Sequence, residues 1–448
     1  MNKKFFRSKE LLIINYSLLI LLSSCSVSSQ ISKEANKTIL RDSATSKGFI
    51  GISIYEPATG KYLYNYNATK YFTPASNTKL FTLYAGMKYL GDSLVGLRYT
   101  IINDTLYALP TGDPSFLNVE FSYQPVIDLL KNYHVPTVFS NQNWKDEKFG
   151  YGWAWDDYNE DYMAERNALP INANIGKIMF WKSHEIASLY PDIINRGFYY
   201  KINYNFEPGR KKVFVKRKPT ENTFDIYFGK ESQNYSVQIP LVTNGISSSL
   251  EILHSLYWWI SKNDSSFNIQ HSTFNLIKSI PTDSLFRPMM HRSDNFFAEQ
   301  TLLMVSNERL GYMSDADIID TLLNSDLKDI PQKPKWVDGS GLSRYNLFTP
   351  QAFIYILNKL RDEFGWDRVR NILPTGGEGT LTSYFHKDSG FIYAKTGTLS
   401  NNCALSGFLL TNSGKFLIFS ILANHYQSGA TPIRKASERF LEMIRQKY

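Results

Sequence analysis

Residues 48–55, Gly-Phe-Ile-Gly-Ile-Ser-Ile-Tyr, alternate small or apolar residues, and residues 61–66 form a second run of strand-forming residues. The segment between them, Glu56-Pro-Ala-Thr-Gly60, is rich in turn formers. A period of two is typical of β-strands, and Pro and Gly favour turns. We therefore predict a β-hairpin over 48–66.

The pattern changes over residues 75–90, where the period becomes helical. Apolar residues recur there at intervals of three and four, at Leu80, Leu83, Tyr84, Met87 and Leu90. This spacing is typical of one face of an α-helix, and Gly91 is a common helix stop. We predict a helix over 75–90, with Ser76 at its start.

The middle of the chain, 93–245, consists of short strand-like runs, aromatic-rich loops and several turn signals. The clearest runs are 106–109, 212–216 and 223–228. We interpret this region as one or two inserted β-rich domains.

Helical periodicity returns in 245–262 and 294–305, and the C-terminal part predicts three strands followed by a helix, at 390–395, 404–411, 415–423 and 432–446. The N-terminal hairpin and the C-terminal strands can join in one antiparallel sheet covered by helices, which is an α+β architecture. The helix-covered domain is then discontinuous. Its first part is 48–92, and its second part is 246–448.

The N-terminus predicts export. Basic residues precede a mostly apolar run over 11–22, so 1–24 is typical of a signal peptide and is too short to span a bilayer. It ends in Leu22-Ser-Ser-Cys25, which resembles the lipobox of bacterial lipoproteins, and an incidental cysteine is the alternative. We expect a periplasmic protein that Cys25 anchors to a membrane, the outer membrane being favoured, through a polar tether over 25–47.

Composition narrows the class of protein further. The chain has 448 residues, 43% hydrophobic and 20% charged, as in folded proteins of two or three domains. The formal charge is +8, of which residues 1–24 contribute +3, and nucleic acid is not expected as a partner. Cys403 is the only other cysteine, and the seven histidines show neither the HExxH spacing nor any pairing with cysteines, so no zinc site is expected.

Three short motifs occur in order along the chain: Ser76-Asn-Thr-Lys79, Ser293-Asp-Asn295 and Lys395-Thr-Gly-Thr398. Ser76 and Lys79 are three residues apart, so a helix places both side chains on one face. A serine hydroxyl is a poor nucleophile until a base takes its proton, and lysine can be that base only if its pKa falls toward neutrality. We predict that Ser76 is a nucleophile and Lys79 its base.

Each motif has a simpler interpretation when taken alone. Ser76 could cap a helix, Lys79 could be a solvated helix residue, and Asn295 could cap the following helix. Lys395 could be a charge that protects an edge strand. The joint occurrence of the three motifs favours a catalytic set.

The triplet resembles that of penicillin-recognising serine enzymes. Six segments resemble the D-alanyl-D-alanine carboxypeptidase/endopeptidase (DacB-like) family of low-molecular-mass penicillin-binding proteins: 73–80, 112–115, 293–299, 338–346, 373–377 and 394–398. The resemblance covers essentially the whole mature chain. It implies a transpeptidase/β-lactamase-like domain whose insertion, 93–245, lies between the first two motifs.

The resemblance also implies an activity and a role for each motif. The substrates would be peptidoglycan stem peptides, cleaved through an acyl-enzyme, and β-lactams would be covalent inhibitors. The resemblance implies no metal and no organic cofactor. Ser293 would relay a proton and Asn295 would hold Lys79 and the substrate. The third motif would bind the substrate and its terminal carboxylate through Lys395, Thr396, Gly397 and Thr398. The backbone N–H groups of Ser76 and Thr398 would bind the oxyanion.

Two alternatives stay open from the sequence. One is a β-lactamase or esterase of the same fold, and the other is a non-catalytic wall-binding lipoprotein. Glu308, Asp338 and Glu378 are acidic, but none lies in the glutamate-containing loop motif of class A β-lactamases. We therefore expect Lys79 to serve both acylation and deacylation.

Overall fold

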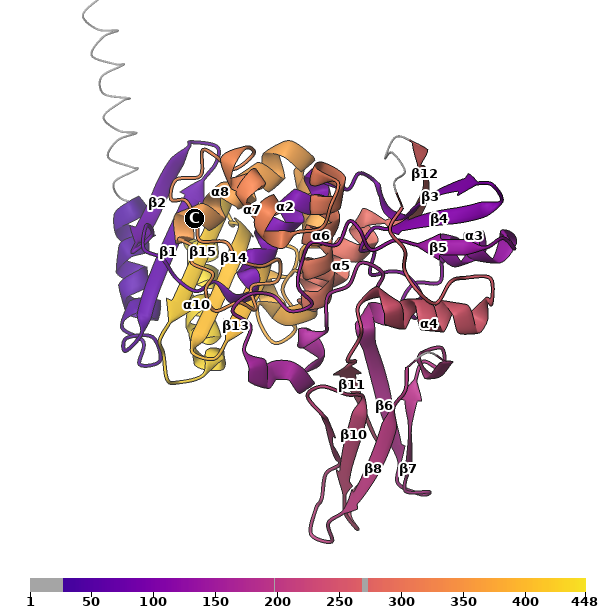
Figure 1. Cartoon of the computed structure of the whole chain (residues 1–448). Helices are drawn as coiled ribbons and strands as arrows, with labels where there is room; N and C mark the ends of the chain where they lie inside the picture. Colours follow the sequence, from indigo (N-terminus) through magenta and orange to yellow (C-terminus); the bar gives the residue numbers. More distant parts are fainter. Residues whose placement is uncertain (1–26, 197, 268–272) are drawn as a thin grey trace, which may run out of the picture. The chain divides into compact units, whose positions relative to one another are not determined.

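The computed structural model describes residues 27–196, 198–267 and 273–448, which form two compact units (Figure 1). The first unit contains the described residues up to Asn77, Ile330–Pro334 and Leu347–Tyr448. The second contains Thr78–Asp329 and Lys335–Asn346. The predicted signal peptide, 1–24, and Cys25 lie outside the described residues.

The first unit is built on a five-stranded antiparallel sheet with the strand order β13-β14-β15-β1-β2. Its strands are β1 (Phe49–Glu56), β2 (Lys61–Tyr66), β13 (Ile392–Leu399), β14 (Asn402–Leu410) and β15 (Phe416–Asn424). The predicted hairpin and its union with the C-terminal strands are therefore confirmed. Strand β13, which carries the third motif, lies at one edge of the sheet.

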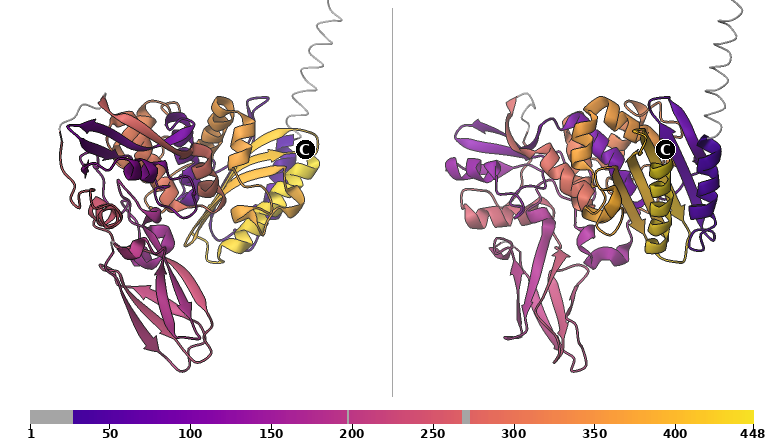
Figure 2. Two further views of the ribbon diagram at one scale, coloured as in Figure 1. Left: turned by 90° about the vertical axis from the view of Figure 1, so that its right-hand side faces the viewer. Right: turned by 180° about the vertical axis from the view of Figure 1, so that it is seen from behind.

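Helices cover both faces of this sheet. The long helix α10 (Ala430–Lys447) packs on one face, where its predicted apolar positions Ile433, Ala436, Phe440 and Ile444 are buried in one core with residues of the strands (Figure 2). Helix α8 (Pro350–Phe364) packs against β1, β14 and β15 and is followed by α9 (Trp366–Ile372). The α+β architecture follows from this arrangement.

The segment expected to be a tether differs from that expectation. Residues 27–35 are helical and continue into the helical turn η1 (Asn36–Leu40). Ile31, Ala35 and Ile39 are fully buried in the core shared with α10. These three apolar residues recur every fourth position, so they form one helical stripe that gains free energy when it is removed from water.

The second unit contains three further sheets and several helices, two of which begin at Lys79 and Asn295, the last residues of the first two motifs. The helices are α2 (Lys79–Tyr89), α3 (Pro125–Asn132), α4 (Ile246–Leu256), α5 (Thr282–His291), α6 (Asn295–Leu310) and α7 (Asp315–Asn324). A four-stranded sheet has the order β12-β3-β4-β5, with β3 (Ser93–Ile102), β4 (Thr105–Pro110), β5 (Thr137–Phe139) and β12 (Asn275–Pro281). Within the described residues, no helix combines the length and the apolar character needed to cross a membrane.

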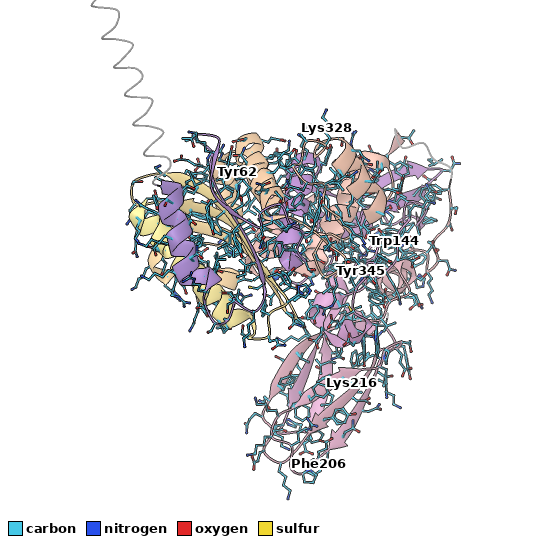
Figure 3. All side chains as sticks on the ribbon, turned by 90° about the vertical axis from the view of Figure 1, so that its left-hand side faces the viewer. Tyr62, Trp144, Phe206, Lys216, Lys328 and Tyr345 are labelled. Carbon is cyan, nitrogen blue, oxygen red and sulfur yellow. The ribbon has the colours of Figure 1, made fainter. Side chains whose placement is uncertain are left out.

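Two three-stranded sheets form a separate lobe of the second unit (Figure 3), on which Lys216 and Phe206 are labelled. Their orders are β11-β6-β7 and β8-β10-β9, with β6 (Ile175–Trp181), β7 (Ile186–Tyr190), β8 (Lys201–Phe206), β9 (Phe214–Arg217), β10 (Thr223–Phe228) and β11 (Tyr235–Pro240). The rings of Phe180 and Phe228 lie 5.1 Å apart between the two sheets. The prediction of an inserted β-rich region is thus confirmed.

The boundary of this region differs from the predicted one at residue 245. Strand β12, from Asn275, pairs with β3 and completes the four-stranded sheet. Helix α4 buries Ile246, Leu250 and Leu253 in the same core as that sheet. Both elements therefore belong with the insertion. The sequence pattern did not show this for β12, because its pairing with β3 joins residues 176 to 188 positions apart and a local pattern carries no information on such contacts.

Candidate active site

Ser76 lies in the 3-10 turn η2 (Ala75–Thr78), which leads directly into α2. Lys79 is the first residue of α2 and follows this turn directly, so the first motif spans the start of the helix. Ala75, just before Ser76, has a φ of 48°, in the left-handed region that alanine rarely adopts. Such strain is common at functional sites.

A chain of buried side-chain hydrogen bonds fixes the turn η2 to the five-stranded sheet. Asn77 Nδ2 donates to Ser406 Oγ at 2.7 Å, and Ser406 Oγ donates to Ser420 Oγ at 2.8 Å. All three residues are fully buried. Buried hydrogen bonds of this kind hold their side chains in one arrangement. The sequence analysis did not assign roles to these residues, because their spacing along the chain carries no signal.

The backbone of β13 approaches Ser76 very closely. A Cβ atom added at Gly397 would lie 2.5 Å from the carbonyl oxygen of Pro74 and 3.1 Å from the amide nitrogen of Ser76. No side chain fits in this space, which explains the glycine in the third motif. Gly397 precedes Thr398, so the two amides expected to bind an oxyanion come from neighbouring segments of the first unit.

The other residues of the third motif occupy both faces of β13. Lys395 is fully buried, and its Nζ donates to the carbonyl oxygen of Thr396 at 2.7 Å. Thr396 Oγ1 donates to Thr380 Oγ1 at 2.7 Å. Thr398 is exposed, and its Oγ1 accepts a hydrogen bond from Arg434, a residue that the sequence analysis missed.

In the second unit, Lys79 is fully buried at the start of α2. Its Nζ donates to Asn295 Oδ1 at 2.7 Å and to the carbonyl oxygen of Ser340 at 2.8 Å. Burial lowers the pKa of Lys79 to about 8, because desolvation outweighs the opposing charges of Asp338 and Glu299. A lysine with this pKa can accept and return a proton near neutral pH.

The second motif forms the start of α6. Ser293 has a φ of 66°, and Asp294 caps the helix by accepting from the amide of Phe297 at 2.9 Å. Asn295 Nδ2 donates to the carbonyl oxygen of Tyr162 at 3.1 Å. The suggestion that this motif caps a helix therefore holds for Asp294, while the Asn295 side chain contacts Lys79.

A pocket of about 320 Å³ adjoins this motif within the second unit. Its polar lining includes Ser293, Asn295, Asp161, Glu120 and Arg292. Burial raises the pKa of Asp161, and the nearby Asp294 raises it further. The pocket therefore offers hydrogen-bonding groups and room for part of a polar ligand beside Asn295.

Behind Lys79 lies a buried charge network centred on Arg166. Its guanidinium contacts Asp146 and Asp315 at 2.6 Å each and Glu299 at 3.3 Å. Glu299 also accepts from the amide of Ser340 at 2.7 Å, so it holds the segment whose carbonyl oxygen binds Lys79. Burial raises the pKa of Glu299 to about 8.

One sequence signal could have identified Glu299, which lies four residues after Asn295 and thus on the same face of α6. Arg166 and Asp146 had no such signal.

The three acidic residues considered for deacylation have other partners or positions. Asp338 accepts four hydrogen bonds, from the amides of Gly341 and Ser343 and from the side chains of Asn346 and Trp153. Glu308 pairs with Arg98 at 2.7 Å. Glu378 lies in the first unit, before the turn η8 (Gly379–Leu381).

The remaining 3-10 turns of the described chain are η3 (Trp155–Asn159), η4 (Asp161–Met163), η5 (Asn172–Asn174), η6 (Ile194–Arg196) and η9 (His386–Asp388). No group of three or more potential metal ligands occurs among residues 27–196, 198–267 and 273–448.

The chain is similar to known proteins along most of its length. The model of the D-Ala-D-Ala carboxypeptidase 3 (S13) family matches residues 33–187 and 262–444. The chain is 24% identical to penicillin-sensitive carboxypeptidase A of Dictyostelium discoideum, covering 85% of this chain and 83% of that protein. It is 22% identical to D-alanyl-D-alanine carboxypeptidase DacB of Haemophilus influenzae, covering 85% and 86%.

The fold is similar to that of a solved structure, penicillin binding protein 4 of Haemophilus influenzae. The TM-score is 0.71 at 18% identity, and the alignment covers 93% of this chain and 99% of that one. The two chains share a fold along almost their whole length.

Proposed function

Because the chain belongs to the D-Ala-D-Ala carboxypeptidase 3 (S13) family, we propose that it is a serine-type D-Ala-D-Ala carboxypeptidase and endopeptidase that cleaves peptidoglycan stem peptides. The observation that carries the proposal is the buried Lys79, whose pKa is lowered to about 8 one helical turn from Ser76. A solvated structural lysine would keep its ordinary pKa near 10.4.

Acylation follows from the roles of the first two motifs. The neutral amine of Lys79 takes the proton of Ser76 Oγ, which attacks the carbonyl carbon of the penultimate D-Ala. The resulting oxyanion accepts from the amides of Ser76 and Thr398, and each such donor contributes roughly 3 to 4 kcal/mol at the transition state. The C–N bond then breaks, and the leaving amine receives the proton from Lys79 by way of Ser293.

Substrate recognition falls to the third motif and to Asn295. Lys395 attracts the terminal carboxylate of the peptide, and the hydroxyl of Thr398 donates to it. The edge of β13 can pair with the extended peptide backbone, as exposed sheet edges often do. Asn295 holds Lys79 on one side and the substrate backbone on the other.

Deacylation needs water at the ester of Ser76 and a base to take its proton. Lys79 serves again as that base, because Asp338 is already occupied by four donors. After peptide cleavage the D-Ala leaves and clears the path of the water. An opened β-lactam keeps its amine attached near the ester, so the penicilloyl-enzyme is long-lived and the protein is inhibited by β-lactams rather than destroying them.

The names of two relatives, a penicillin-sensitive carboxypeptidase and a penicillin binding protein, support the proposal that β-lactams inhibit this protein.

The test is covalent labelling with fluorescent penicillin, followed by peptide mapping and by incubation with muropeptides. Label on Ser76, loss of label in Ser76→Ala and release of D-Ala are expected. The matched control is Ser325→Ala, an exposed serine at the end of α7, which should label normally. Label at another residue, or rapid hydrolysis of a chromogenic cephalosporin, would contradict the proposal.

The location of the protein is part of the proposal. The charged and apolar pattern of 1–24 and the lipobox-like Leu22–Cys25 support export to the periplasm and attachment of lipid to Cys25, with the outer membrane as the favoured site. Cys25→Ser should leave the membrane fraction and take up no labelled palmitate. If the wild-type protein takes up no lipid label, the anchor is excluded.

A further inference from the structure

Arg434 lies in the second turn of α10, beside the third motif in the first unit. Its Nη2 donates to Thr398 Oγ1, and its guanidinium lies 5.7 Å from the centre of the Tyr384 ring. Arg434 belongs to none of the three motifs.

The register of β13 and β14 shows on which face of the sheet each residue of the motif lies. Thr398 pairs with Cys403 and Thr396 with Leu405, and the last two belong to the core shared with α10. Directly opposed residues of antiparallel strands project to the same face. Thr396 and Thr398 therefore project toward the α10 face, where Arg434 lies.

Lys395 and Gly397 project to the other face. Lys395 pairs with Ser406, which is bound to Asn77, and Gly397 abuts the amide of Ser76. The edge of β13 thus has a cation on each side, Lys395 on the face of the nucleophile and Arg434 on the face of α10.

Arg434 forms no ion pair within the described part of the chain. Among the described residues, no carboxylate lies within ion-pair distance of its guanidinium, and its Nε is buried without a hydrogen-bond partner. Its other neighbours are Cys403 and Tyr426. Burial raises the pKa of both side chains, and the positive charge of Arg434 acts in the opposite direction. The next acid on the same side of α10, Glu438, accepts from the amide of Phe385 instead.

A half-buried guanidinium without an anion is unfavourable, and a bound carboxylate would compensate it. The geometry at Thr398 suits this ligand. Because Thr398 Oγ1 accepts from Arg434, its own hydroxyl proton is free to be donated to a carboxylate oxygen. A guanidinium also presents paired N–H groups that match the two oxygens of a carboxylate, which an ammonium does not.

We propose that Arg434 is a second carboxylate-binding cation of the site, which acts with Thr398 from the face of β13 opposite Lys395 and selects peptides with a free C-terminal carboxylate. The proposal rests on the peptidase function proposed above. It assigns to α10 a direct part in substrate specificity. It also predicts that endopeptidase substrates, whose acceptor strand lacks a carboxylate at this position, depend less on Arg434 than carboxypeptidase substrates do.

The experiment compares two peptides, one ending in D-Ala-D-Ala and one carrying its C-terminal amide, with the full chain. Arg434→Ala should lower kcat/KM for the free acid by about tenfold to a hundredfold, mainly through KM, and should change the value for the amide by less than about threefold. Arg434→Lys should recover part of the loss, because it restores the charge without the paired donors. The matched control is Lys435→Ala, which removes an exposed charge from the neighbouring position of α10 and should behave as wild type.

The contrasting interpretation is that Arg434 only holds α10 against β13. In that case Arg434→Ala would lower kcat/KM for acid and amide equally and would lower the melting temperature, and this result would overturn the proposal. Wild-type behaviour of Arg434→Ala on the free acid would overturn it as well. Failure of the wild-type protein to cleave either peptide or to react with penicillin would instead refute the peptidase function, and this proposal would fall with it.

Discussion

The Nζ atom of Lys79 lies 2.7 Å from Oδ1 of Asn295, the first residue of α6. The amide oxygen is a strong acceptor without a net charge, so it orients the amine without stabilising its protonated form as a carboxylate would. Ser340 contributes a second neutral acceptor, its carbonyl oxygen. The site thus fixes the position of a lysine and keeps its pKa low at the same time.

The first prediction concerns the pH dependence of acylation. The proposed base is the neutral form of Lys79, and burial lowers the pKa of this residue to about 8. The rate of reaction with fluorescent penicillin should therefore rise about tenfold per pH unit below 8 and become constant above it. A midpoint near 10.4, the ordinary value for lysine, would show that Lys79 is not the base.

The second prediction tests the neutral partner of Lys79. In Asn295→Asp a carboxylate would lie beside the amine and favour its charged form, which should raise the pKa of Lys79 by about 1 to 3 units. Acylation at pH 7.5 should fall at least about tenfold and should recover partly at pH 10. Asn132→Asp, at the exposed end of α3, is the control and should leave the pH profile unchanged. An unshifted midpoint in Asn295→Asp would contradict the contact.

The third prediction concerns the close approach at Gly397. In Gly397→Ala the new Cβ would lie 2.5 Å from the Pro74 carbonyl oxygen, so β13 must move away from Ser76. Because the amides of Ser76 and Thr398, which we propose bind the oxyanion, would then separate, acylation should fall about a hundredfold or more. Gly209→Ala is the control, since an added Cβ there meets no atom within 4 Å. Normal labelling of Gly397→Ala would show that the two amides do not act together.

The fourth prediction concerns the charge network behind Lys79. Arg166→Met would leave Asp146, Asp315 and Glu299 buried without their cation, which should cost about 3 to 5 kcal/mol of unfolding free energy. The melting temperature should fall accordingly. Lys182→Met, which breaks an exposed pair with Glu185, should cost less than about 1 kcal/mol. Equal melting temperatures for the two variants would mean that the network does not stabilise the second unit.

The features found correctly from the sequence are those in which neighbours along the chain become neighbours in space. The hairpin over 48–66 and the helix start at Ser76 depend on local periodicity and turn residues. The charged and apolar pattern of 1–24 is a local signal of the same kind, although its outcome lies outside the described residues. The segment 27–40 shows the limit of composition, because its polar character concealed the stripe of Ile31, Ala35 and Ile39.

The sequence by itself determined which residues are candidates for the site: a serine three residues before a lysine, an Asn motif, and a Lys-Thr-Gly-Thr segment. Only the tertiary structure decided that Lys79 is buried between Asn295 and Ser340, that Glu299 and Arg166 support it, and that Arg434 reaches Thr398. The physical reason is that burial and charge pairing act through space. Arg434 is 36 residues from Thr398 in the chain, and their contact exists only because α10 folds back onto the face of the sheet where Thr398 projects.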